Sequence, residues 1–399
     1  MRQYKLGRTL IKTFSRTANR DEFMVAGRPS ADIDHPATYA GAIDCDLHPA
    51  LPGMHALMPY LDDYWREMVS VRALDRLNFS LTSYPQNAPL SCRPDWKPEG
   101  AAKPGASLEA MQSHVLDRYR PRFGILNCLY GAQVMHSEDM AAVFCRATND
   151  WIRDEWLGRD PRLRASIVIP AHNTELAVAE IERWAGDPRF VQVLMLVSGE
   201  VTLGRRQLWP IYQAAERLGL PIGVHAGSAY RYAPTAVGWP SYYVEDYVAQ
   251  SSAFENQLQS LISEGVFAKF PGLKLVAIES GLTWLSGFIW RADKTWKGVR
   301  AEVPWVTRAP SEIIRDHVRF TVQPIDAPDE LAALMRLIEH LESDELFLFS
   351  TDYPHWQFDG DDALPTGLSE TVRCKILCGN ALATYPRLAG ANSAMEVNA

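Results

Sequence analysis

The chain has 399 residues and the composition of an ordinary globular protein, with 47% hydrophobic and 22% charged residues. Its net charge of -8 argues against a nucleic-acid-binding protein, which would usually be basic. No apolar run reaches the ~18 residues that a transmembrane helix needs. The six cysteines are scattered without a Cys-x-x-Cys pair, so we expect reduced thiols and a cytoplasmic location.

Residues 1–40 are expected to form a basic N-terminal extension, because several basic residues precede the first acidic one, Asp21. This segment lacks the apolar region of a secretory signal. An organellar presequence and a basic arm are two interpretations. We prefer a third, a tail that packs on a neighbouring subunit or stays mobile. Residues 391–399 are expected to form a C-terminal tail.

Between these ends, apolar strand patterns alternate with helical patterns. The expected strands are 42–48, 122–128, 164–170, 190–196, 221–226, 273–279, 317–323 and 345–351. The helical patterns are 137–158, 174–185, 207–218, 241–264, 282–300 and 328–342. Near-continuous apolar strands with helical crossovers indicate a parallel sheet, and eight of them predict a closed (β/α)8 TIM barrel over residues 41–390. A doubly wound open sheet is the alternative, but its usual Gly-x-Gly-x-x-Gly signal follows none of these strands.

Polar residues stand at the carboxyl ends of the expected strands, where the active sites of such barrels lie. Asp46 and His48 are two residues apart and share one face of the first strand. His225 ends the fifth strand, and Asp352 follows the eighth. Two carboxylates and two imidazoles at strand ends predict a site for one metal ion. Taken alone, Asp352 could equally be the cap of the following helix.

Further polar residues end other strands, namely Asn127 on the second, Glu279 on the sixth and Gln323 on the seventh, with His172 just past the third. A surface loop explains His172 on its own, and a turn cap explains Asn127. The combination of so many polar strand ends is harder to explain by packing alone. We therefore include Asn127 among the candidate substrate contacts.

A Pro-rich insertion, residues 77–107, lies between the first and second expected strands. A segment of that length on the catalytic side of a barrel is usually a lid or a contact with a partner. Tyr84 and Arg93 within it are candidate substrate contacts.

A second insertion follows His225 and is dense in aromatic residues. It supplies Tyr230, Arg231 and Trp239 as candidate substrate contacts. Such density suits a flat aromatic substrate, with Arg231 or Arg93 binding its carboxylate. Packing in a homodimer or larger homo-oligomer explains the same residues equally well, because aromatic and Arg side chains also favour interfaces.

Several motifs together resemble the amidohydrolase superfamily, and most closely the amidohydrolase-2 branch around aminocarboxymuconate-semialdehyde decarboxylase. They are Asp46-x-His48, His225 in Gly-Val-His-Ala-Gly, Phe270-Pro-x-Leu-Lys, Ser-Thr-Asp352-Tyr-Pro-His, and Gly379-Asn380-Ala381 with Tyr385. The resemblance spans roughly residues 40–390. It implies one divalent metal ion held by Asp46, His48, His225 and Asp352, together with a water.

The sequence departs from the family pattern at two positions. Asp46 replaces the usual first His of a His-x-His pair. Zn²⁺ is the expected metal, and the extra carboxylate makes Mn²⁺ the alternative. Glu279 stands where many members place a catalytic His, and it can act as an acid or base if burial raises its pKa. His355 and His172 are candidates to replace it.

The residues and the resemblance together predict a metal-dependent enzyme acting on a small-molecule carboxylate or carbonyl substrate. The first hypothesis is non-oxidative decarboxylation of a small aromatic or unsaturated acid, with a strand-end acid protonating the carbon that loses CO₂. The alternative is hydrolysis of an amide, lactone or C–C bond by a metal-activated water, with Asp352 as the base. A non-catalytic barrel within a complex is a third hypothesis, which the intact ligand set argues against.

Overall fold

The computed structural model describes residues 38–74, 92–100, 102–227, 232–326 and 330–390. The chain divides between Pro36 and Ala37, so all described residues belong to the second unit. Residues 1–37 of the expected basic extension, residues 77–91 of the Pro-rich insertion and the tail 391–399 lie outside the described residues.

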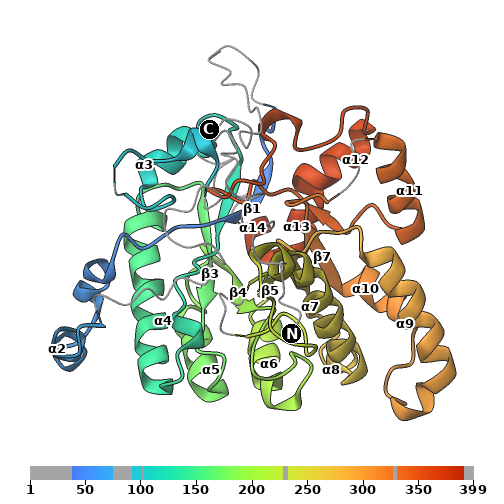
Figure 1. The fold of residues 1–399 in the computed structure, drawn as a ribbon, viewed down its shortest axis with the longest axis horizontal. Coiled ribbons are helices and arrows are strands. Elements are labelled where there is room, and N and C mark those ends of the chain that lie inside the picture. Colours follow the sequence, from blue (N-terminus) through green and yellow to red (C-terminus); the bar gives the residue numbers. More distant parts are fainter. Residues whose placement is uncertain (1–37, 75–91, 101, 228–231, 327–329, 391–399) are drawn as a thin grey trace, which may run out of the picture. The chain divides into compact units, whose positions relative to one another are not determined.

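Eight strands form one parallel sheet, and they are hydrogen-bonded in chain order (Figure 1). They are β1 (Ile43–Leu47), β2 (Phe123–Leu126), β3 (Leu163–Val168), β4 (Phe190–Leu196), β5 (Ile222–His225), β6 (Leu275–Ile278), β7 (Val318–Thr321) and β8 (Phe347–Leu348). Every residue of these strands is buried, which explains why their sequences are nearly continuous apolar runs. All eight expected strands are confirmed.

The sheet nearly closes on itself because segments of β1 and β8 meet. The amide of Cys45 donates to the carbonyl of Phe349 at 2.9 Å. Asp44 reinforces this seam, since its carboxylate accepts from the amide of Thr351 at 3.0 Å and from its hydroxyl at 2.7 Å. The predicted (β/α)8 barrel is therefore confirmed.

The α-helices lie around the outside of the strands (Figure 1). They are α2 (Asp63–Val71), α3 (Leu108–Met111), α4 (Glu138–Ile152), α5 (Thr174–Arg183), α6 (Trp209–Arg217), α7 (Tyr243–Ser263), α8 (Val266–Lys269), α9 (Leu285–Val299), α10 (Pro310–His317), α11 (Leu331–Leu341), α12 (Glu370–Cys374), α13 (Asn380–Thr384) and α14 (Pro386–Gly390). Each of the six expected helical segments contains one of them. Within the described ranges, no helix combines the length and apolarity that crossing a membrane requires.

The segment after β8 returns to the amino-terminal ends of β4 and β5 and covers that end of the barrel. The guanidinium of Arg387 donates to the carbonyls of Asp187 at 3.2 Å and Phe190 at 2.8 Å. It also donates to the carbonyl of Leu218 at 3.3 Å. Tyr385, two residues earlier, is fully buried. The side chain of Arg387 thus links the segments that lead into β4 and β5.

Replacing Arg387 should therefore destabilise the fold. We expect Arg387→Met to lower the free energy of unfolding by about 1–3 kcal/mol, because buried carbonyls lose their donors. Urea denaturation measures this loss. Arg308→Met is the matched control, because Arg308 makes only surface ion pairs with Glu312 and Asp316 and should cost less than about 1 kcal/mol. Equal losses in the two variants would contradict the proposed tie.

Candidate metal centre

Carboxylates and imidazoles from four strand ends meet inside the mouth of the barrel. Asp46 and His48 come from the end of β1, and His225 is the last residue of β5. Glu279 directly follows β6, and Asp352 lies just beyond β8. All five side chains are buried. Because parallel strands end at the same rim, residues far apart in the sequence are brought together here.

The nitrogen and oxygen atoms of this group lie within a few ångströms of one another. His48 Nε2 is 3.3 Å from Asp46 Oδ1 and 2.9 Å from Asp352 Oδ1. His225 Nε2 is 3.7 Å from Asp46 Oδ2 and 3.4 Å from Glu279 Oε2. Ligands about 2.1 Å from one metal ion would be separated by about 3.0–3.4 Å, so these spacings suit a shared cation.

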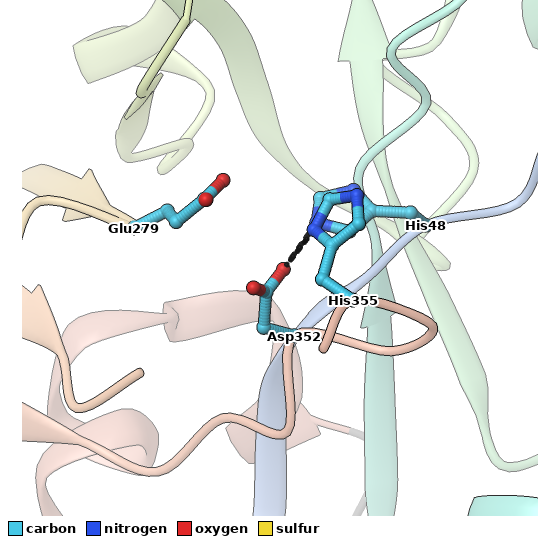
Figure 2. Close-up of side chains that lie close together, drawn as sticks. All are labelled: His48, Glu279, Asp352 and His355. Carbon is cyan, nitrogen blue, oxygen red and sulfur yellow. Dashed lines mark hydrogen bonds and ion pairs between the residues drawn. The ribbon is translucent and has the colours of Figure 1, made fainter. Parts of the chain in front are cut away.

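His355 joins the same group from the turn after β8. Its Nδ1 lies 2.7 Å from Asp352 Oδ1. In Figure 2, the side chains of Glu279 and Asp352 point toward the imidazoles of His48 and His355. Two overlapping sets of possible metal ligands result, one of Asp46, His48 and His225 and one of His48, Glu279, Asp352 and His355.

Backbone carbonyls determine which face each imidazole presents. His48 Nδ1 lies 2.9 Å from the carbonyl of Asn127, and His225 Nδ1 lies 2.7 Å from that of Ala226. A carbonyl only accepts, so Nδ1 carries a proton in each ring, and in the neutral form of each ring Nε2 is the nitrogen that could bind a metal ion. Lone pairs and carboxylate oxygens cannot lie this close in a dry site without a positive charge between them.

The electrostatics of the buried group agree with this need. Burial alone would lower the pKa of His48, but the carboxylates of Asp46 and Asp352 raise it well above its usual value. Among the described residues, Asp46 Oδ2, His225 Nε2 and Asp352 Oδ2 have no hydrogen-bond partner although all three are buried. These unpartnered atoms and the mixed oxygen and nitrogen donors fit one divalent cation.

Two of the carboxylates stand on unusual backbone. Glu279 has φ 56° and Asp352 has φ 55°, in the left-handed region that residues other than glycine rarely adopt. Such a conformation costs of order 1–3 kcal/mol and persists only where the surroundings enforce it. Thr321 helps at β6, because its hydroxyl accepts from the amide of Glu279 at 3.0 Å. Both carboxylates thus point inward from backbone that is locally strained.

Glu279 is held by one oxygen and leaves the other for the cluster. Its Oε1 accepts from the Tyr247 hydroxyl at 3.0 Å and from Gln357 Nε2 at 3.2 Å. Its Oε2 is the oxygen that faces His225. Burial, and then the charge of Asp352, raise the pKa of Glu279 above its usual value, against the opposing charge of the nearby histidines. These surroundings therefore make Glu279 a weaker acid than a carboxyl group in water.

The remaining polar residues of the expected strand ends do not belong to the ligand sets. His172 faces Glu200, with 3.8 Å between Nδ1 and the carboxylate, and its ring lies 6.4 Å from that of His136. Asn127 is fully buried, and both ends of its side-chain amide are used within the protein.

Of the candidate substrate contacts from the two insertions, only Arg93 and Trp239 lie in the described part of the chain, and neither belongs to the ligand sets. Arg93 is occupied by Asp95, at 2.8 Å, and by the carbonyl of Phe358, at 3.1 Å. Trp239 is 59% exposed. Tyr84, Tyr230 and Arg231 lie outside the described residues.

Sequence reasoning named Gln323 at the end of the seventh strand without assigning it a role, and it missed Gln133, Tyr247 and Gln357. Gln323, two residues beyond β7, and Gln133, after β2, are buried with both amide atoms unpartnered in the part of the chain that the structure describes. For Tyr247 on α7 and Gln357 after β8 the sequence held no signal, because their contact with Glu279 depends on tertiary packing.

A (β/α)8 barrel with a buried oxygen and nitrogen donor cluster at the carboxyl ends of its strands defines a metal-dependent barrel enzyme. The amidohydrolase family model matches residues 43–387, and the chain belongs to that family. This confirms the family that the sequence motifs indicated.

Relatives of known activity and structure are similar to this chain. A gamma-resorcylate decarboxylase from Polaromonas sp. (strain JS666 / ATCC BAA-500) is 26% identical over 261 residues, covering 59% of this chain and 74% of that protein. A dihydroxybenzoic acid decarboxylase from Polaromonas sp. JS666, solved with manganese and the inhibitor 2-nitroresorcinol, has a TM-score of 0.61 at 19% identity, covering 86% of this chain and 96% of that one. A 5-carboxyvanillate decarboxylase from Sphingomonas paucimobilis has a TM-score of 0.63 at 18% identity, covering 87% of this chain and 99% of that one. These structural likenesses establish the shared fold.

Proposed function

We propose that this protein is a metal-dependent decarboxylase of a small aromatic carboxylic acid. The observation that carries the proposal is the buried donor cluster with a carboxyl group, Glu279, that faces it through Oε2 and whose pKa burial raises. The similarity to a gamma-resorcylate decarboxylase supports the reaction class. A metal to hold the substrate and an acid to protonate a carbon are the two parts that non-oxidative decarboxylation needs.

In the proposed centre, Asp46, His48, His225 and Asp352 hold one divalent ion. When bound, that ion would neutralise the substrate carboxylate and polarise the oxygen beside it. The sequence led us to expect zinc, with manganese as the alternative. The two carboxylates of the set favour the harder ion, and the related decarboxylase from Polaromonas sp. JS666 holds manganese. We therefore place manganese first.

The proposed chemistry requires no oxidant or second substrate. The bond between the ring carbon and the carboxylate breaks, and its electron pair stays on the ring carbon. The proton of Glu279 forms the new C–H bond there, and CO₂ leaves. Tyr247 and Gln357 hold Glu279 Oε1, so the proton would be delivered from Oε2 toward the cluster. Water then restores the proton of Glu279.

The structure offers amide groups for the rest of the substrate. Gln323 and Gln133 are buried, and neither the donor nor the acceptor of either side-chain amide has a partner among the described residues. Buried amides without partners are rare, and a bound ligand commonly explains them. A hydroxyl group on the substrate ring both donates and accepts hydrogen bonds, so it could pair with the NH₂ group and the oxygen of such an amide. We propose that these two residues orient the substrate, in place of Arg93, whose guanidinium is already occupied.

The metal assignment predicts the behaviour of ligand variants. Purified protein should hold about one divalent ion per chain, and Asp352→Asn and His225→Ala should lose most of it while keeping the circular dichroism of the fold. Metal content is measured by mass spectrometry. His317→Ala is the matched control, because His317 is also buried with Nδ1 2.9 Å from a carbonyl, that of Leu273, but lies at the start of β7. Full metal content in both ligand variants would reject the assignment.

Isotope labelling should distinguish decarboxylation from hydrolysis. With 2,6-dihydroxybenzoate or 5-carboxyvanillate in D₂O, we expect CO₂ release and one deuterium at the vacated ring carbon. Mass spectrometry and proton NMR detect both. An aromatic product that carries ¹⁸O from labelled water, with no CO₂ released, would overturn the proposal in favour of the hydrolytic alternative.

The role of Glu279 predicts a loss of rate with metal retained. Glu279→Gln keeps the shape and the contacts to Tyr247 but cannot deliver the proton, so kcat should fall by about 10²–10⁴-fold. Steady-state kinetics and metal analysis are measured together. Glu180→Gln is the control, since Glu180 is equally buried on α5 and bonds to Asn149 and Trp184. An unchanged kcat in Glu279→Gln would remove Glu279 from the mechanism.

Substrate orientation predicts a different kinetic signature for Gln323. Replacing it with Leu removes hydrogen bonds to the substrate and leaves the metal ligands intact. We expect KM to rise by about tenfold, since one such hydrogen bond contributes about 1 kcal/mol or more. Metal content should be unchanged. A KM equal to that of the wild type would place Gln323 outside the substrate pocket.

A further inference from the structure

We infer that Asn127 is a positioning residue that presents two of the proposed metal ligands, Asp46 and His48, to the ion. This inference rests on the proposed metal assignment. It adds a residue that contacts the proposed ligands rather than the ion. Asn127 directly follows β2 and is fully buried.

Asn127 contacts both ligands through different groups. Its side-chain Nδ2 donates to Asp46 Oδ1 at 2.8 Å and to the carbonyl of Cys45 at 3.2 Å. Its own carbonyl accepts from His48 Nδ1 at 2.9 Å. The amide of Asn127 also donates to the carbonyl of Leu47 at 2.7 Å, which keeps β2 in register with the end of β1.

These contacts decide which atoms remain for an ion. With Oδ1 of Asp46 engaged by Asn127, Oδ2 is left without a hydrogen-bond partner on the side of His225. The carbonyl of Asn127 selects the His48 tautomer whose Nε2 lone pair faces the carboxylates. Outer partners of this kind fix the orientation and basicity of metal ligands.

A chain of hydrogen bonds fixes the orientation of the Asn127 amide. Its Oδ1 accepts from Ser166 Oγ at 2.6 Å and from Gln192 Nε2 at 3.2 Å. Gln192 Nε2 also donates to Ser166 Oγ at 2.8 Å, and Gln192 Oε1 accepts from the Tyr385 hydroxyl at 3.0 Å. Every donor points the same way, from Tyr385 toward Asp46. Reversing the Asn127 amide would set its NH₂ against two donors and leave Asp46 without one.

The strand next to β4 leaves room for this chain of hydrogen bonds. A Cβ on Gly223 of β5 would lie 2.4 Å from the Gln192 amide carbon, so only glycine allows Gln192 to occupy its position. Residues from β2, β3, β4, β5 and the C-terminal segment therefore combine to hold one amide group. Packing alone would be served by apolar side chains, which need no such arrangement.

The alternative is a buried polar network that only stabilises the barrel. Metal affinity separates the two roles, because a purely structural group would change the free energy of unfolding and leave the affinity alone. Asn149 provides a matched control. It is as buried as Asn127, and its amide bonds to Glu180 and to both main-chain groups of Val168, outside the cluster.

The experiment measures the Mn²⁺ dissociation constant of metal-free protein by electron paramagnetic resonance, and urea stability in the same samples. Asn127→Leu should weaken Mn²⁺ binding by about 10–100-fold. Asn149→Leu should lower stability but bind Mn²⁺ like the wild type. Ser166→Ala is a smaller change that removes one donor to Asn127, and it should weaken Mn²⁺ binding a few-fold. It tests the role of Asn127 if Asn127→Leu does not fold.

If Asn127→Leu binds Mn²⁺ with the wild-type affinity, the inference is overturned and the proposed metal centre is unaffected. If Asn127→Leu does not fold, wild-type Mn²⁺ affinity in Ser166→Ala has the same meaning. The same holds if Asn149→Leu weakens binding as much as Asn127→Leu. A wild-type protein that binds no divalent ion would instead reject the proposed centre itself, and the role of Asn127 with it.

Discussion

The structure depends on one electrostatic constraint, the need for positive charge between carboxylate oxygens and imidazole lone pairs that are buried together. His48 Nε2 lies 3.3 Å from Asp46 Oδ1 and 2.9 Å from Asp352 Oδ1, and His225 Nε2 lies 3.7 Å from Asp46 Oδ2. All four side chains are buried, and the rings already use Nδ1 on backbone carbonyls. A divalent cation would stabilise all four groups at once, so the features that direct them inward, including the strained backbone at Asp352, fit a metal centre.

The strands that close the barrel also carry the proposed ligands, so the site is complete only when the barrel is closed. The proposed ligands from the first strand and the one after the last strand are more than 300 positions apart in the sequence, yet they meet at the seam that Asp44 and Thr351 tie together. An unfolded chain cannot present such a set. An ion that binds here binds only the folded protein, and its binding energy therefore adds to the stability of the closed barrel.

The sequence predicted the strands and placed Asp46, His48, His225 and Asp352 at their carboxyl ends, where the structure has them. Their role as metal ligands stays a prediction, and the sequence indicated much less about the substrate side. An apolar run followed by a polar residue fixes the direction of that side chain, since parallel strands end at a common rim. Strand patterns do not predict the contacts of Arg93 and His172, which lie in loops. Arg93 is occupied by the nearby Asp95 and by the distant carbonyl of Phe358, and His172 faces Glu200. Asn127 shows the limit even on a strand end, because its side chain turns into the barrel interior toward Ser166 and Gln192.

The charge of the proposed centre explains why a carboxyl group can stand where relatives of this branch often place a histidine. A divalent ion balances Asp46 and Asp352, so the centre is neutral only while Glu279 keeps its proton. An incoming carboxylate adds a further negative charge, which disfavours ionisation of Glu279 more strongly. Burial acts in the same direction. Substrate binding would therefore hold Glu279 in the protonated form that carbon protonation requires, and loss of CO₂, which removes the anionic group, would relax that bias once the proton has been delivered.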